Sequence, residues 1–352
     1  MIVPFVDFKL QYRKLKPEID EAITRVVSNG DFILRQDVEE FEKRLADYVG
    51  TKYAVGVNSG TDALTLALRA AGIKAGDEVI TSAYTFWATV EAIWNVRATP
   101  ILADIKEDLL IDPILIEEKI TLNTKAIIPV HIGGNICDMD KIMRLAVKYN
   151  LAVIEDTAQG LGGEWGGIKA GAIGDIGCFS FYPAKVLGAY GDAGAIATNS
   201  FRFSQAVRAL RDHGRLDKYG IFMAGYNSRL DNLQAAVLNA KFDYLPEWIK
   251  RRQEIGKMYD EGLKDMDGIV LPQSFTYQEF NLRVLGGKRD GLYHYLKDRE
   301  IECLVGSYKF PCVQPPVAMM MNEQILRLPV WPDLSNAQIK FAIKIIREFY
   351  KK

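Results

Sequence analysis

Three short segments carry side chains whose types and spacing could do chemistry. The first is VNSGTDALTLAL, residues 57–68, which leads from an expected strand into a helix through Ser59, Gly60 and Thr61. Unpaired amides at a helix start, hydroxyl groups and the positive end of the helix dipole can together bind an anion. The same residue types also form an ordinary helix cap, so this segment alone leaves both interpretations open.

The second segment is LAVIEDTAQG, residues 151–160, an apolar run that ends in Glu155 and Asp156 and is followed by Gln159. An acid at the carboxyl end of a strand can hold a cationic ring or a metal ion. It can equally cap the next turn, and the segment by itself does not separate these roles.

The third segment is GDIGCFSFYPAKVLGAYGDAGA, residues 174–195, in which an apolar strand leads through Ser180 and Tyr182 to Lys185. Aromatic and small residues flank this lysine on both sides. Partial burial would disfavour its ammonium form and free an amine for imine formation. The alternative is a solvated surface lysine, which is the common case.

The three segments taken together narrow the chemistry. A phosphate cradle, an acid and an amine are what pyridoxal phosphate requires for its phosphate, its pyridine nitrogen and its aldehyde. The signatures G-x-G-x-x-G after a strand, G-x-x-x-x-G-K-[ST] and H-E-x-x-H are all absent, which disfavours NAD-type, P-loop and zincin chemistry. The sequence therefore predicts pyridoxal 5'-phosphate as the cofactor.

Composition sets the broad class of the protein. The chain has 352 residues, of which 49% are apolar, with 44 Lys and Arg against 45 Asp and Glu. This length allows a large core and about two domains, and the balanced charge disfavours nucleic acid as a partner. The four cysteines are scattered without metal-ligand spacing, so no metal site is expected. No apolar run approaches the roughly 18 residues of a membrane span, and we expect a cytoplasmic protein with no membrane partner.

The elements that must position these residues alternate along the chain. Helical stretches such as 61–71, 85–96 and 139–149 separate several short apolar runs, a rhythm typical of an α/β fold with a mostly parallel sheet and helices on both faces. In such a sheet ligands bind beyond the carboxyl ends of the strands. The seven expected strands are residues 53–57, 78–82, 99–105, 125–130, 151–156, 176–181 and 194–198.

The flanking regions are expected to be more helical. Residues 8–50 have helical spacing, and one long amphipathic helix is expected after residue 230, with a kink at Pro246. A helix over 336–350 closes the chain. We expect a large cofactor-binding domain at 1–245 and a smaller C-terminal α+β domain at 246–352.

These segments resemble the DegT/DnrJ family of sugar-nucleotide aminotransferases, which have the fold type I of pyridoxal phosphate enzymes. The resemblance runs from FVDFKLQY at 5–12 through most of the chain and is densest between SGTDAL and GYNSRLDNLQAA. It implies that Lys185 forms the Schiff base, that Asp156 pairs with the pyridine nitrogen and that Gln159 faces the ring hydroxyl.

The resemblance also assigns the remaining cofactor contacts. Gly60, Thr61 and Ser180 would bind the phosphate. Phe86, in YTFWAT, would stack on the ring, although Trp87 next to it could be confused with it and core packing is the competing role. Asn227, in GYNSRLD, matches an asparagine that reaches the phosphate of the neighbouring subunit, so a homodimer with shared active sites is implied; a turn residue is the local alternative.

Several positions depart from the family pattern. Arg35 stands where glycine is usual, and Ser307 and Cys312 replace histidines in a region that often approaches the substrate. These departures put the identity of the sugar in doubt more than the reaction. Arg229 and Tyr190 are conceivable nucleotide-sugar contacts, but the sequence does not separate this role from a structural one.

The implied activity is transfer of an amino group from glutamate to a nucleotide-linked keto deoxysugar by a ping-pong mechanism. GYNSRLD is more similar to members acting at C3 than at C4. Related dehydratases commonly have histidine in place of the imine lysine, so Lys185 favours transamination. A regulatory protein that keeps the fold without turnover is the other alternative, and the intact cofactor set argues against it.

Overall fold

A seven-stranded sheet forms the centre of the protein. The computed structural model describes residues 1–216, 220–306, 310 and 315–351. The strand order is β1-β9-β8-β5-β4-β2-β3, and every pairing is parallel except that β9 runs antiparallel to both β1 and β8. All seven predicted strands are confirmed as β1 (Tyr53–Val57), β2 (Glu78–Ser82), β3 (Thr99–Ala103), β4 (Thr124–Ile128), β5 (Ala152–Asp156), β8 (Ile176–Ser180) and β9 (Gly194–Thr198).

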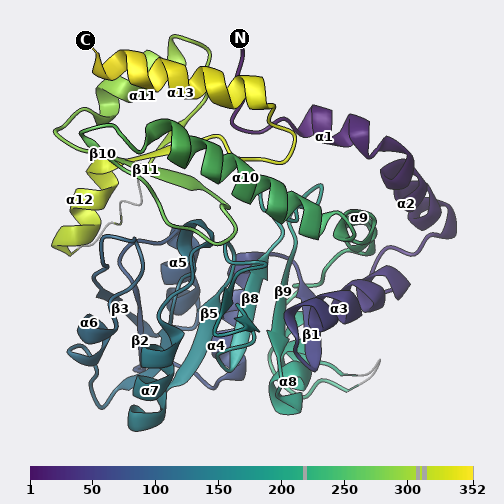
Figure 1. Ribbon diagram of the computed structural model, residues 1–352. Helices are drawn as coiled ribbons and strands as arrows, with labels where there is room; N and C mark the ends of the chain where they lie inside the picture. The colour runs from purple at the N-terminus through teal and green to yellow at the C-terminus, as the bar shows by residue number, and fades with distance from the viewer. Residues whose placement is uncertain (217–219, 307–309, 311–314, 352) are drawn as a thin grey trace.

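Helices cover both faces of this sheet, as the alternation of strands and helices predicts (Figure 1). The strand side chains divide between two faces because successive residues of a strand point in opposite directions. One face packs against α4 (Gly60–Ala70), α5 (Trp87–Asn95) and α8 (Phe201–Arg211). The other packs against α3 (Gln36–Val49) and α9 (Asn232–Phe242) at one end, and against α6 (Pro113–Glu117) and α7 (Met139–Tyr149) at the other.

A second, antiparallel sheet lies beside the first, toward the top of Figure 1. Its order is β10-β11-β13-β12. A separate hydrophobic core joins this sheet to the helices around it. The elements of this region are α10 (Leu245–Leu263), β10 (Ile269–Val270), β11 (Phe280–Val284), α11 (Arg289–Lys297), β12 (Leu304–Val305), α12 (Pro316–Gln324), β13 (Ile325–Leu328) and α13 (Asn336–Tyr350).

The N-terminus also belongs to this second core. Val3 forms a parallel bridge with Ile301 and is fully buried among residues of the C-terminal region. The second sheet and its helices therefore share one hydrophobic core with the first residues of the chain. We propose that the main division follows α9, near residues 245 and 246.

The prediction of a single long helix after residue 230 is wrong. Two helices, α9 and α10, are separated at Asp243 and Tyr244. Pro246 lies in the first turn of α10, where its missing N–H requires no partner. Further inside a helix the proline ring would clash with the carbonyl of Phe242, so a new helix starts instead of a kinked one continuing.

The N-terminal helical region is divided in a similar way. It forms α1 (Phe8–Lys14), α2 (Lys16–Asn29) and α3, and Gly30 and Gly50 end α2 and α3 in the left-handed conformation. The predicted C-terminal helix is confirmed as α13. The remaining short elements are β6 (Glu164–Trp165), β7 (Ile168–Lys169) and a 3-10 turn over Ile132–Gly134. None of the helices in the described ranges has the length and apolar character needed to cross a bilayer.

Candidate active site

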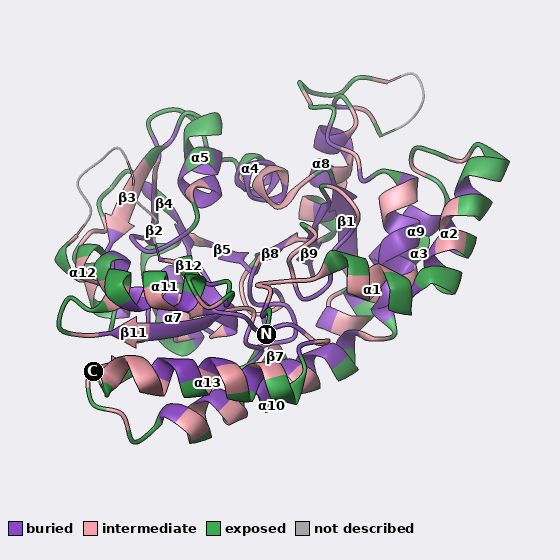
Figure 2. Cartoon of the chain, turned by 90° about the horizontal axis from the view of Figure 1, so that it is seen from above, coloured by how far each residue is buried: buried purple, intermediate pink, exposed green. Residues whose placement is uncertain are grey.

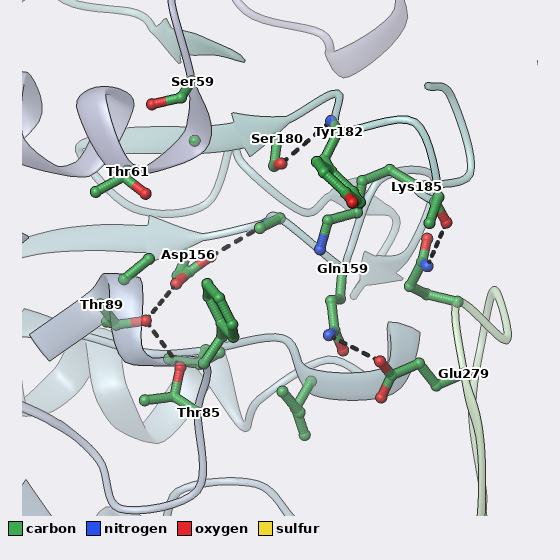
Figure 3. A pocket seen from close by; sticks show the side chains of 18 of the residues that line it. Ser59, Thr61, Thr85, Thr89, Asp156, Gln159, Ser180, Tyr182, Lys185 and Glu279 are labelled. Atoms are coloured by element: carbon green, nitrogen blue, oxygen red, sulfur yellow. Dashed lines mark hydrogen bonds between the residues drawn. The ribbon is translucent and has the colours of Figure 1, made fainter. Parts of the chain in front are cut away.

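A cavity of about 690 Å³ lies at the carboxyl ends of the parallel strands, between the large sheet and the second region. It collects seven of the eight residues predicted for the site, although they come from separate segments of the chain. Figure 3 shows how several of them face a common space. The seven are Gly60, Thr61, Phe86, Asp156, Gln159, Ser180 and Lys185.

One end of the cavity is built as an anion cradle. The Ser59 hydroxyl accepts a hydrogen bond from the Asp62 amide at 3.1 Å and caps α4. Among the described residues, the amides of Gly60 and Thr61 at the start of α4 have no acceptor, so they can bind an anion. A Cβ on Gly60 would lie 2.7 Å from the Cβ of Ser180. Only glycine therefore allows α4 to start this close to the end of β8, and this close approach brings backbone amides and hydroxyls to the same point.

Asp156 forms the deep wall of the cavity. It is the last residue of β5 and is 5% exposed. Its carboxylate accepts hydrogen bonds from the Thr89 hydroxyl at 2.7 Å and from the Ala158 amide at 3.1 Å, and Thr85 lies 2.8 Å from Thr89 (Figure 3). Burial raises the pKa of Asp156, against these hydrogen bonds and the charge of Lys185. A cationic ring bound beside it would favour its ionised form.

Lys185 projects into the cavity from the loop that follows β8 (Figure 3). Within the described chain its Nζ makes no hydrogen bond. Burial lowers the pKa of Lys185, while the negative charges of Glu279 and Asp156 act in the opposite direction. A lysine with a lowered pKa keeps more of its amine unprotonated, which is the form that reacts with a carbonyl group.

Phe86 is a lining residue and not a core residue. It is the N-cap of α5, and it is 62% exposed. Trp87, which the sequence could confuse with it, packs on Trp94 and Phe310 with ring centroids 4.9 and 5.3 Å away. Trp87 does not line the cavity, so of these two neighbours Phe86 is the one that can face a bound ring.

The Gln159 side chain is already engaged by the protein. Its Oε1 accepts a hydrogen bond from the Gly133 amide at 2.5 Å, and its Nε2 donates to Glu279 at 3.3 Å (Figure 3). Gln159 therefore lies where the family role places it, on the cavity wall, while linking the large sheet to the second region. Its contact with the cofactor hydroxyl stays a prediction.

Asn227 lies outside the cavity. It is exposed, and the hydroxyl of its neighbour Ser228 donates to Asp62 in the first turn of α4 at 2.7 Å. Arg229 pairs with Asp212 at 3.0 Å, and the Tyr190 ring packs against the Lys241 ammonium at 4.1 Å. Neither Arg229 nor Tyr190 lines the cavity.

Of the positions that depart from the family pattern, Arg35 is described by the structure, and it does not line the cavity. Arg35 is the N-cap of α3 and forms an exposed ion pair with Asp31 at 3.4 Å. Ser307 and Cys312 lie outside the residues that the structure describes.

Three residues that sequence reasoning missed complete the site. Gln278, Glu279 and Arg327 all line the cavity and come from the second region. Glu279 accepts a hydrogen bond from Arg327 at 3.0 Å. No local motif marks these residues. Gln278 lies 92 positions from Val186, and Glu279 lies 120 positions from Gln159, so the sequence contains no signal for them.

Gln278 holds the backbone on both sides of Lys185. Its Oε1 accepts a hydrogen bond from the Val186 amide at 2.8 Å, and its Nε2 donates to the Ala184 carbonyl at 3.1 Å. One side-chain amide from the second region therefore fixes the loop at the residues before and after the lysine. This arrangement restrains the position from which the Lys185 side chain enters the cavity.

The cavity fits pyridoxal phosphate. Its anion cradle suits a phosphate, its buried acid suits a protonated pyridine nitrogen, and its amine lies within the same enclosure. Residues 13–347 match the DegT/DnrJ/EryC1/StrS aminotransferase family. The chain belongs to this family.

Individual relatives cover nearly the whole chain. A "Pleiotropic regulatory protein" of Geobacillus stearothermophilus is 38% identical over 100% of this chain and 99% of its own length. The "dTDP-3-amino-3,4,6-trideoxy-alpha-D-glucose transaminase" of Streptomyces venezuelae is 38% identical over 99% of this chain and 97% of its own. Other relatives are named as aminotransferases of dTDP- or UDP-linked sugars.

The solved structures agree with this assignment. S. venezuelae DesV, crystallised in complex with a ketimine intermediate, superposes with a TM-score of 0.96 at 38% identity, covering 100% of this chain and 99% of DesV. Another solved relative contains the aminated cofactor. This member of the DegT/DnrJ/EryC1/StrS family is therefore a transaminase that depends on pyridoxal phosphate, as its sequence predicts.

The Gln278 contacts lead to a first test. We expect Gln278→Leu to lower kcat about 30-fold with little change in KM, because two hydrogen bonds of roughly 1 kcal/mol each no longer restrain the Lys185 loop. Steady-state kinetics with cofactor-loaded protein measure the split. Gln253→Leu, which removes a hydrogen bond to the Phe275 carbonyl between two residues that do not line the cavity, is the control and should retain normal kcat. Equal activity of both variants would contradict the positioning role of Gln278.

Proposed function

We propose that this transaminase transfers the amino group of glutamate to the C3 keto group of a nucleotide-linked deoxysugar by a ping-pong mechanism. The observation that carries the proposal is the convergence of Lys185, Asp156 and the α4 anion cradle on one cavity. The names of the relatives, which include C3-aminated dTDP and UDP sugars, support both the nucleotide-linked substrate and the C3 position.

The residues of the chain divide the work. When bound, pyridoxal phosphate supplies an aldehyde that takes up the amino group and a ring that withdraws electrons. Gly60, Thr61 and Ser180 hold the phosphate, and Phe86 covers the ring. Asp156 keeps the ring nitrogen protonated; an ion pair of this kind at 4 Å is worth about 4 kcal/mol at an effective dielectric constant near 20.

Lys185 serves as the proton carrier. Once the amino-acid donor has replaced Lys185 at the cofactor, the free Nζ of Lys185 can accept the proton from Cα of glutamate and later deliver a proton to C3 of the sugar. Its lowered pKa favours the neutral amine that the first transfer requires. One cavity serves both substrates in turn, which favours a ping-pong order.

The reaction is tested by adding the two substrates one at a time. Yellow, cofactor-loaded protein should lose its colour with glutamate and recover it on addition of a 3-keto sugar nucleotide, with a product whose mass shows one added amino group. The matching 4-keto sugar nucleotide is the control and should restore the colour much more slowly. Protein that binds the cofactor but never loses colour would support a regulatory role, and a faster reaction with the 4-keto sugar would contradict the C3 assignment.

We also propose a homodimer in which Asn227 of each subunit completes the site of the other. Asn227 is exposed in its own chain, and the segment around it presents apolar side chains to solvent. The exposed fractions are 76% for Ile221 and 62% for Phe222. Phe32, whose carbonyl accepts a hydrogen bond from the Asn232 amide, is 50% exposed. Neighbouring apolar side chains that are both exposed, as Ile221 and Phe222 are, support a protein interface at this segment.

Hybrid dimers test the shared site. Lys185→Ala and Asn227→Ala should each be nearly inactive alone, while a refolded equal mixture should regain roughly a quarter of normal activity, because half of the dimers then hold one intact site. Activity of the mixture is compared with that of each variant refolded alone. A mixture no more active than its components would contradict a site built from two chains.

A further inference from the structure

An arginine and a glutamate form a mostly buried pair on the cavity wall that the second region supplies. Arg327 lies on β13, and Glu279 immediately precedes β11, which pairs with β13. The Arg327 Nη1 and Glu279 Oε1 atoms are 3.0 Å apart, and the two side chains are only 15% and 12% exposed. Both residues line the cavity that contains Lys185.

Arg327 is the cation on this wall whose partner is a side chain that also lines the cavity: its Nη1 donates to Glu279 at 3.0 Å, and its Nη2 donates to the Val305 carbonyl at 3.2 Å. Three cationic side chains occur among the described lining residues, and they are Lys185, Arg252 and Arg327. Lys185 is assigned to the cofactor. Arg252 is committed to the backbone, because its Nη1 donates to the carbonyls of Tyr277, Gln278 and Val330 at 3.1, 3.4 and 2.6 Å.

The two substrates place opposite demands on this wall. An amino-acid donor carries a carboxylate on the same carbon as its amino group, so a donor that reacts beside Lys185 brings a negative charge into the cavity with it. Withdrawal of that charge from water is costly unless a cation receives it, and guanidinium groups match carboxylates with two parallel hydrogen bonds. A keto sugar ring that follows brings no such group, and an arginine prepared for the donor would then be left buried without its partner.

Glu279 resolves this conflict. Its carboxylate neutralises Arg327 when the donor is absent, and it has a second hydrogen-bond partner in Gln159 Nε2 at 3.3 Å. Glu279 therefore still accepts a hydrogen bond from Gln159 when Arg327 binds the carboxylate of a substrate instead. The Arg327–Glu279 ion pair can therefore break when the charged donor binds and form again when the uncharged sugar ring binds, and neither buried charge is then left without a partner.

We propose that Arg327 binds the α-carboxylate of the amino-acid donor and that Glu279 pairs with Arg327 when no donor is bound. This inference rests on the proposed function, since it assumes an amino-acid donor at Lys185. It adds a donor site and a substrate exchange that neither the family match nor the names of the relatives assign.

The test uses α-methylglutamate, which has the donor carboxylates but no α-proton to lose. Calorimetric titration of cofactor-loaded protein should show that Arg327→Gln raises the dissociation constant about 30-fold. The KM for the keto sugar nucleotide, measured on the aminated enzyme, should change by less than about 3-fold, because a neutral ring does not need the guanidinium. Glu279→Gln should bind α-methylglutamate more tightly than the unmodified protein, since the competing carboxylate is gone.

Arg283→Gln is the matched control. Arg283 lies on β11 of the same sheet and pairs with Glu107 at 3.0 Å outside this cavity, so its loss should leave donor binding unchanged. If Arg327→Gln does not fold, Arg327→Lys keeps the charge without the two-pronged geometry and should still weaken binding about 10-fold. Unchanged donor binding in the Arg327 variants, or an equal loss for donor and sugar, would overturn the inference while leaving the transaminase assignment intact. An unmodified protein that binds no amino acid would overturn both.

Discussion

The structure depends on keeping one lysine amine partly out of water, within reach of two carboxylates. Burial disfavours the charged form of Lys185, and the charges of Asp156 and Glu279 limit that effect. Burial also disfavours the charged form of Asp156. The pKa of Asp156 is thus raised and that of Lys185 lowered. A bound cationic ring would favour the ionised form of Asp156 and leave the amine of Lys185 reactive. Most other features of the site serve to hold these two side chains in place.

The topology of the large sheet brings these groups together. The carboxyl ends of β1, β5 and β8 meet at one edge because these strands run in the same direction, and each is followed at once by site residues. The antiparallel β9 presents its start at the same edge. There a Cβ on Gly194 would lie 2.3 Å from the Ser59 carbonyl oxygen. Because glycine has no side chain, the sheet and the start of α4 can approach each other closely at this point. The second region then closes the cavity with Gln278, Glu279 and Arg327. Figure 2 shows the central strands largely in the colour of buried residues, whereas the surrounding helices carry both buried and exposed residues.

The sequence predicted what depends on local pattern. Continuous apolar runs predicted the seven strands because a parallel sheet is buried on both faces, and the site segments lie at strand ends, where chain order alone places them. Contacts between distant segments could not be predicted. Gln278 meets Ala184 and Val186 only after the second region docks, and the break between α9 and α10 depends on the tight turn before Pro246. The role proposed for Asn227 would depend on a second chain, and Ser307 and Cys312 lie outside the described residues.

One measurement tests the central claim most directly. Borohydride reduction of the yellow protein should attach the cofactor irreversibly, and digestion followed by mass spectrometry should then find the label on the peptide that contains Lys185 and on no other. Lys185→Ala protein treated in the same way should carry no label. A label at another lysine, or normal labelling of the Lys185→Ala protein, would contradict the account.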